Sequence, residues 1–158
     1  MTKPTPFLWF DNNAEEAMNF YLSIFPNSKV GTVTRYGGGG PGPAGTVMTA
    51  SFQLGGQDFV ALNGGPMHKF SEAISFVVNC ETQAEVDRFW DKLTAGGGEP
   101  GPCGWLKDRY GLSWQIVPTI LPKLLSDKDP AKSGRAMAAM MKMSKLDGDA
   151  LKRAYDGA

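Results

Sequence analysis

Histidine and cysteine, the residue types that most often ligate metals or act as nucleophiles, are scarce in this chain of 158 residues, which has one histidine and two cysteines. His68 lies in a predicted linking loop, where we expect an exposed or loop-packing imidazole rather than a ligand. Cys80 and Cys103 form neither a CxxC pair nor a disulfide framework, so we expect free thiols that are buried or half-buried. The alternative is a reactive thiol, and for Cys103 only Lys107 and Arg109 are near enough in sequence to lower its pKa.

The glycine-rich segment 37–45 is the second feature that could do chemistry, because glycine loops cradle phosphates. It contains six glycines and two prolines. A phosphate-binding loop, however, ends in GK[ST] and opens a helix, as does a dinucleotide-binding loop. Residues 46–54 alternate as a strand does, so the segment is predicted to be a hairpin loop.

The elements that must position any site come as one pattern used twice. Residues 7–10 and 74–78 are apolar runs typical of strands, and each leads through a short polar turn into an amphipathic helix. Large apolar side chains at spacings of three and four define the buried face of each helix. These are Ala14, Ala17, Met18, Tyr21 and Phe25 in the first copy, and Val86, Phe89, Trp90 and Leu93 in the second.

Both helices also begin with the same chemistry. Asn13 and Thr82 each stand three residues before a glutamate, Glu16 and Glu85, which is the spacing of a capping box. We therefore predict a side-chain cap at each N-terminus, with the glutamate complementing the helix dipole.

Strands are predicted after each helix, which gives two βαβββ modules in an α+β fold. The predicted strands are 29–36, 46–54 and 58–63 in the first copy, and 101–107 and 112–117 in the second. We expect the first module at 1–65, the second at 66–118 and a helical C-terminal extension at 119–158. The extension is predicted to hold helices at 119–126, 130–143 and 149–155, with its methionines (Met137, Met140, Met141, Met143) filling a core or an interface.

The charge balance excludes several partners. Sixteen basic and sixteen acidic residues cancel, and no stretch combines clustered Lys and Arg with exposed aromatics. We therefore expect neither nucleic acid nor a membrane surface as a partner. No apolar run approaches the roughly 20 residues that a transmembrane helix needs, and the start lacks the pattern of a secretory signal. These features predict a cytoplasmic protein.

The repeated βαβββ unit resembles the vicinal oxygen chelate superfamily, which contains glyoxalase I, extradiol dioxygenases and bleomycin-resistance proteins. Particular motifs are similar to its PhnB-like branch, labelled 3-demethylubiquinone-9 3-methyltransferase. They are Phe20-Tyr21 followed by 25–28 (FPNS), 63–66 (NGGP), 103–108 (CGWLKD) and 111–118 (GLSWQIVP). The resemblance covers nearly the whole chain before the C-terminal extension. It implies a curved mixed sheet folded around a cleft.

The resemblance also indicates where metal ligands of the superfamily would stand. Aligned on the D-x-x-G-x-x-x-E pattern, Asp108 and Gly111 match, but Gln115 replaces the ligand glutamate. The two first-strand histidines fall at Pro6 and Ser75, and the last strand of the first module offers only Asn63. Zinc sites are built from His, Cys, Asp and Glu, and magnesium or calcium sites need carboxylates. We therefore expect no metal and no other cofactor.

A ligand-binding cleft lined by alternating residues is the remaining expectation. If Gln115 faces this cleft, the strand period sends Ser113 and Val117 the same way, with Trp114 and Ile116 toward the helices. The predicted lining is apolar with a few neutral hydrogen-bonding groups, so it suits an uncharged or aromatic ligand. Its predicted members are Leu8, Phe10, Asn63, Ser75, Val77, Trp105, Ser113 and Gln115, with Trp105 at the rim and Trp9, Trp90 and Trp114 in the core.

Three functions remain open from the sequence. The first is a metal-free small-molecule-binding protein similar to bleomycin-resistance proteins, which we expect to form a homodimer. The second is a metal-assisted lyase, isomerase or dioxygenase of the same superfamily, with displaced ligands such as His68, Glu72 and Asp108. The third is the methyltransferase of the branch label, although no glycine-rich strand-to-helix turn for S-adenosylmethionine is present. Sequence alone does not decide whether the protein is an enzyme.

Overall fold

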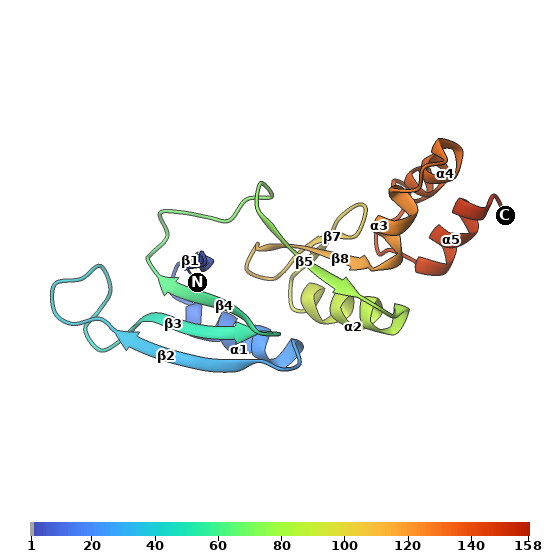
Figure 1. Ribbon diagram of the computed structural model, residues 1–158. Helices are drawn as coiled ribbons and strands as arrows, with labels where there is room; N and C mark the ends of the chain where they lie inside the picture. The colour runs from blue at the N-terminus through green and yellow to red at the C-terminus, as the bar shows by residue number, and fades with distance from the viewer. Residues whose placement is uncertain (1) are drawn as a thin grey trace. The chain divides into compact units, whose positions relative to one another are not determined.

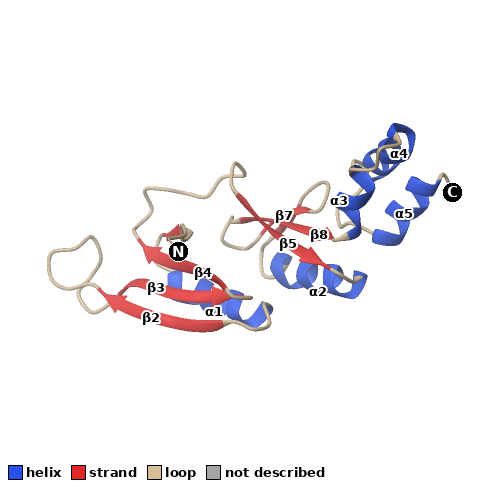
Figure 2. Cartoon of the chain, viewed as in Figure 1, coloured by secondary structure: helices blue, strands red, loops and turns tan. Residues whose placement is uncertain are grey.

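The computed structural model describes residues 2–158, and the chain divides into two compact units with the boundary between Phe70 and Ser71 (Figure 1). Each unit contains one four-stranded mixed sheet and one helix packed against it (Figure 2). The α+β class predicted from the repeated pattern is confirmed.

The first unit has the element order β-α-β-β-β. Its elements are β1 (Phe7–Phe10), α1 (Ala14–Ile24), β2 (Lys29–Arg35), β3 (Val47–Leu54) and β4 (Gln57–Asn63). The strand order is β1-β4-β3-β2, with β1 parallel to β4 and the other pairs antiparallel. Gly55 and Gly56 connect β3 to β4 with φ of 54° and 85°, the left-handed conformation that a two-residue hairpin of this kind requires.

The second unit repeats this order and adds three helices. Its elements are β5 (Ser75–Cys80), α2 (Gln83–Thr94), β6 (Glu99–Pro100), β7 (Trp105–Lys107), β8 (Ser113–Pro118), α3 (Ile120–Leu125), α4 (Pro130–Met140) and α5 (Gly148–Asp156). The strand order β5-β8-β7-β6 corresponds strand for strand to that of the first unit, and β5 is parallel to β8. The duplicated module is therefore present at the level of topology.

The strand predicted at 101–107 is shorter in the structure. Strand β7 begins only at Trp105, because residues 101–104 form a turn. Within this turn, Cys103 and Gly104 have φ of 58° and 85°, which an extended strand cannot accommodate.

Both helices bury the predicted stripes. In α1 the buried residues include Ala14, Ala17, Met18 and Tyr21, with Ile24 rather than Phe25 completing the stripe. In α2 all four predicted residues, Val86, Phe89, Trp90 and Leu93, are buried.

The two helix N-termini are capped differently. Thr82 caps α2, since its hydroxyl accepts a hydrogen bond from Glu85 N at 3.2 Å. The corresponding prediction for Asn13 is wrong, because its side chain makes no capping bond. Instead Oδ1 of Asn63, at the end of β4, accepts from Ala14 N at 2.8 Å. The cap comes from a strand that lies beside the start of the helix only in the folded unit.

The C-terminal helices have a small core of their own. It consists of Leu121, Leu124, Ala136, Leu146 and Leu151, with Met140 and Met143 among the side chains packed against it. Met137 and Met141 are exposed in the single chain, so the core part of the predicted core-or-interface role applies to Met140 and Met143, and an interface role for the other two stays a prediction. No helix among residues 2–158 is long and apolar enough to span a lipid bilayer.

Candidate functional site

The turn between β7 and β8 is organised by one buried carboxylate. Oδ1 of Asp108 accepts hydrogen bonds from Tyr110 N at 2.8 Å and Leu112 N at 3.1 Å, and Oδ2 accepts from Trp114 Nε1 at 2.9 Å. Only 2% of Asp108 is exposed. Three N–H donors satisfy this carboxylate, so its role in the structure is to fix where β8 begins.

Strand β8 has two chemically different faces. Trp114 and Ile116 are buried on the side that α2 covers, together with Leu106 of β7. The opposite side, which we call the distal face, carries the side chains that alternate with these. The distal face consists of Ser75, Val77 and Asn79 of β5, Trp105 and Lys107 of β7, and Ser113, Gln115 and Val117 of β8.

A polar pair lies in the middle of this distal face. Nε2 of Gln115 donates a hydrogen bond to Oγ of Ser75 at 2.9 Å. Trp105 stands directly opposite Gln115 on β7, and Val77 stands opposite it on β5 with 50% of its surface exposed. The pair therefore presents neutral polar atoms between an indole ring and an aliphatic side chain.

Cys103 and Trp105 together line two cavities on the second unit. The first has a volume of about 370 Å³ and is bounded by the distal face and the C-terminal helices. Its other lining residues are Val77, Asn79, Gln115, Val117, Leu121, Pro122, Leu125 and Met140. We call it the helix-side cavity, and its described lining contains no charged side chain.

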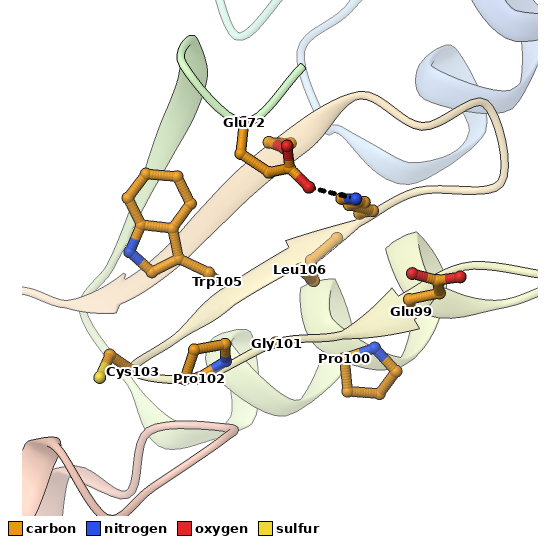
Figure 3. A pocket seen from close by; sticks show the side chains of 10 residues that line it. Glu72, Glu99, Pro100, Gly101, Pro102, Cys103, Trp105 and Leu106 are labelled. Atoms are coloured by element: carbon orange, nitrogen blue, oxygen red, sulfur yellow. Dashed lines mark ion pairs between the residues drawn. The ribbon is translucent and has the colours of Figure 1, made fainter. Parts of the chain in front are cut away.

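The second cavity, of about 380 Å³, is more polar (Figure 3). We call it the turn-side cavity, because it includes the 101–103 turn as well as Trp105 and Ser113. Glu72 points toward Lys107 and forms an ion pair with it. The hydrogen bond from Lys107 lowers the pKa of Glu72, and the same bond raises the pKa of Lys107. Both groups are solvent-exposed, so the pair contributes little to stability.

Ser113 is a buried hydroxyl in the wall of the turn-side cavity. Only 1% of the residue is exposed, and its Oγ has no hydrogen-bond partner among residues 2–158. Buried polar groups are nearly always paired, so an unpaired hydroxyl at a cavity wall marks a position where a ligand or a water molecule can bond.

The structure brings together five of the eight side chains predicted to line a cleft. Ser75, Val77, Trp105, Ser113 and Gln115 all lie on the distal face of the second unit. Trp105 lines both cavities.

The other three predicted residues belong to the first unit and have a different environment. Leu8 pairs in register with Ala61, and Phe10 with Asn63, on the face that α1 covers. The prediction that Leu8 and Phe10 face away from the helix layer is therefore corrected, and the Asn63 side chain is used as the cap of α1. The exposed side of β1 carries Phe7 and Trp9 instead. Since all four residues of β1 are apolar, the sequence has no alternation that would set the direction.

Trp9 is half-buried rather than a core residue. Its Nε1 donates to Gly65 O at 2.8 Å, and its ring packs edge-on against the exposed His68 at 4.8 Å. His68 thus packs in a loop as expected. Among residues 2–158, no three His, Cys, Asp or Glu side chains are grouped so that they could hold a metal ion.

The two cysteines are free and differ in environment. Burial, with a smaller effect from Glu85, raises the pKa of Cys80 to about 11 from its ordinary 9.0, so this thiol stays protonated near neutral pH. Cys103 is half-buried, lines both cavities and lies 3.7 Å from Sδ of Met141.

Comparisons with known proteins agree with this architecture. The family model described as 3-demethylubiquinone-9 3-methyltransferase matches residues 2–117. A solved PhnB protein from Bacillus cereus is 40% identical, with a TM-score of 0.65, and the match covers 74% of this chain and 99% of that one. A search of curated proteins gave no match.

More distant structures share the fold. Protein PA1353 from Pseudomonas aeruginosa is 22% identical over 75% of this chain and 98% of its own, with a TM-score of 0.61. The fosfomycin resistance protein FosX from Listeria monocytogenes, solved with Mn(II) and sulfate, is 12% identical over 74% of this chain and 89% of its own, with a TM-score of 0.53. With its duplicated βαβββ module and the match to the family model, this chain belongs to the 3-demethylubiquinone-9 3-methyltransferase (PhnB-like) family.

Proposed function

We propose that this protein binds an uncharged, apolar or aromatic small molecule on the distal face of the second unit, as a binding protein of the glyoxalase/bleomycin-resistance type. The observation that carries the proposal is the Gln115–Ser75 pair, set between Trp105 and Val77 beside a cavity of about 370 Å³. Small-molecule sites commonly have volumes of about 300–1,000 Å³ and combine apolar walls with a few fixed polar groups.

The polar atoms at this site favour a neutral ligand. One end of the Gln115 amide bonds to Ser75, and the other end has no partner among residues 2–158, so it can bond to a hydroxyl or carbonyl group. Burying an ionised group against Val77, Trp105 and Val117 would cost several kcal/mol without an opposite charge. Flat rings gain additionally from contact with an indole such as that of Trp105.

The family description names a methyltransferase, and the structure offers specific grounds for favouring binding over methyl transfer. S-adenosylmethionine is usually held by a glycine-rich turn that opens a helix. Here the glycine-rich segment 37–45 is followed by strand β3. A ligand present at about 100 times its dissociation constant adds about 2.7 kcal/mol to stability. We expect S-adenosylmethionine to cause no thermal shift.

Isothermal titration calorimetry with two probes tests the proposal. The probes are para-hexylphenol and a short-chain 3-demethylubiquinone analogue, the compound class that the family description names. Gln115→Leu keeps the volume of the side chain but removes its hydrogen bonds, so it should weaken binding roughly two- to tenfold. Gln57→Leu, at an exposed position in the first unit, is the matched control and should bind like wild type. If wild type bound neither probe, the proposal would be wrong.

We also propose a homodimer. Several large apolar side chains are exposed in the single chain, which is typical of surfaces that associate. They include Phe7, Val30, Ile74 and Val77. Light scattering on the purified protein should give twice the mass of 17.0 kDa, and a monomer at micromolar concentration would contradict the proposal.

A further inference from the structure

The helix-side cavity has walls of two different origins. One wall is the distal face of the sheet, which belongs to the βαβββ module. The other is formed by Leu121, Pro122 and Leu125 of α3 and by Met140 of α4. These helices lie beyond residue 117, where the family model ends. The Bacillus cereus relative is covered to 99% by a match that uses only 74% of this chain, so it has no counterpart to the rest.

The added wall is held firmly against the second unit. The side chain of Gln83, at the start of α2, donates to Leu146 O and accepts from Gly148 N, both at 2.9 Å. Lys145 forms an ion pair with Asp87 of α2 at 2.9 Å. These bonds join the C-terminal helices to α2 at a fixed place.

The turn that lines the cavity is joined to the same segment. Cys103 N and Gly104 N donate to Met143 O and Ser144 O, each at 2.8 Å. A Cβ on Gly104 would lie 2.8 Å from Leu146, so glycine allows this close approach. The C-terminal helices therefore behave as a built wall of the cavity rather than as a loosely attached segment.

The chemistry of the wall is entirely apolar. Leu121, Leu125 and Met140 face a cavity whose described lining carries no charge. Its polar side-chain groups are the amides of Asn79 and Gln115, the thiol of Cys103 and the indole N–H of Trp105. The turn-side cavity, in contrast, contains Glu72, Glu99 and Lys107. An uncharged ligand with its polar group at Gln115 therefore has one apolar direction in which to extend, which is toward α3 and α4.

We propose that the C-terminal helices form an apolar subsite that sets ligand specificity by accepting a hydrocarbon or aromatic extension of the bound molecule. The inference rests on the proposed function and concerns the same site. It assigns Leu125 and Met140 as specificity-determining residues, which the shorter family members cannot provide through the same segment. The selected ligand class is a neutral ring that carries an apolar substituent.

The test compares two probes that differ only in this substituent, para-hexylphenol and para-cresol. Leu125→Trp fills the subsite and should weaken binding of para-hexylphenol at least about tenfold, while the affinity for para-cresol changes less than about twofold. Met137→Trp is the matched control, because Met137 lies on α4 with 43% of its surface exposed and does not line the cavity. It should bind both probes like wild type.

A second variant covers the case in which Leu125→Trp does not fold, as judged by circular dichroism and thermal melting. Pro122→Trp replaces an exposed residue that also lines the cavity, and the same loss of selectivity is expected. If the folded variant bound para-hexylphenol and para-cresol with the same affinities as wild type does, the proposed subsite would be overturned. If wild type bound the 3-demethylubiquinone analogue but neither phenol, the subsite would also be overturned. If wild type bound none of the three probes, the proposed function would be overturned instead, so the two failures are distinguishable.

Discussion

The amide of Gln115 donates a hydrogen bond to the hydroxyl of Ser75 across the parallel strands β8 and β5, at 2.9 Å. The family resemblance places a metal-ligating glutamate at position 115 and a ligating histidine at position 75. In this chain the two side chains are neutral and bond to each other. The polar centre of the distal face is thus an amide–hydroxyl pair, which matches the neutral ligand that we propose.

Because neutral side chains stand at positions 115 and 75, we predict that the protein holds no metal ion there. Protein purified without chelators should contain zinc, iron and manganese far below one ion per chain, because no three His, Cys, Asp or Glu side chains gather in residues 2–158. Elemental analysis by mass spectrometry measures this directly. A stoichiometric metal that survived dialysis would support the metal-assisted alternative.

The cap of α1 gives a paired stability prediction. Asn63→Ala removes the acceptor of Ala14 N and the donor to Val47 O, so it should lower the free energy of unfolding by about 1–2 kcal/mol. Asn13→Ala should change it by less than about 0.5 kcal/mol, since the Asn13 side chain makes no capping bond. Urea denaturation of both variants decides between the two asparagines. The assignment fails if Asn13→Ala is the more destabilising.

Asp108 gives a second stability prediction. Asp108→Ala leaves two backbone N–H groups and the indole N–H of Trp114 without their acceptor, so it should cost about 3 kcal/mol or more. Asp108→Asn keeps one acceptor oxygen and should cost less. Asp91→Ala, at an exposed position on α2, is the control and should be within about 0.5 kcal/mol of wild type. An Asp108→Ala variant as stable as this control would contradict the assigned role.

Because Cys80 is buried, we predict that the free energy of unfolding depends on pH in the alkaline range. The unfolded thiol loses its proton near its ordinary pKa of 9.0, whereas the folded one holds it up to about 11. The contribution of the Cys80 thiol to the free energy of unfolding is therefore fully present below pH 9. It is lost as the pH rises from 9 to about 11, by at most about 1.4 kcal/mol per pH unit. Denaturant titrations should show a shallower decline for Cys80→Ala than for wild type. Equal slopes in the two proteins would refute the prediction.

The sequence predicts the fold well because the signals that define it are local and occur twice. The spacing of Val86, Phe89, Trp90 and Leu93 is a property of one helix, and all four are buried as predicted. The predicted side-chain directions in β8 are also correct, because the apolar Trp114 and Ile116 alternate in sequence with the more polar Ser113 and Gln115. Where the pattern alternates, the side-chain direction can be read from it.

The errors occur where the pattern is uniform or where the partner is distant. Strand β1 is apolar throughout, so the sequence does not show that Leu8 and Phe10 face α1. The cap of α1 is misassigned because Asn63 is 49 positions from Ala14 in sequence. For the same reason the cavity wall supplied by Leu125 and Met140 could not be predicted, because it depends on tertiary packing of helices that follow the repeated modules.

The most direct measurement is the change in side-chain N–H resonances when para-hexylphenol is added to ¹⁵N-labelled protein. The indole of Trp105 and the amide of Gln115, assigned with Trp105→Phe and Gln115→Leu, should shift in a saturable way. The indole of Trp9 and the amide of Gln57, both in the first unit, should stay in place. Shifts confined to the first unit, or no shifts at all, would contradict a ligand site on the distal face of the second unit.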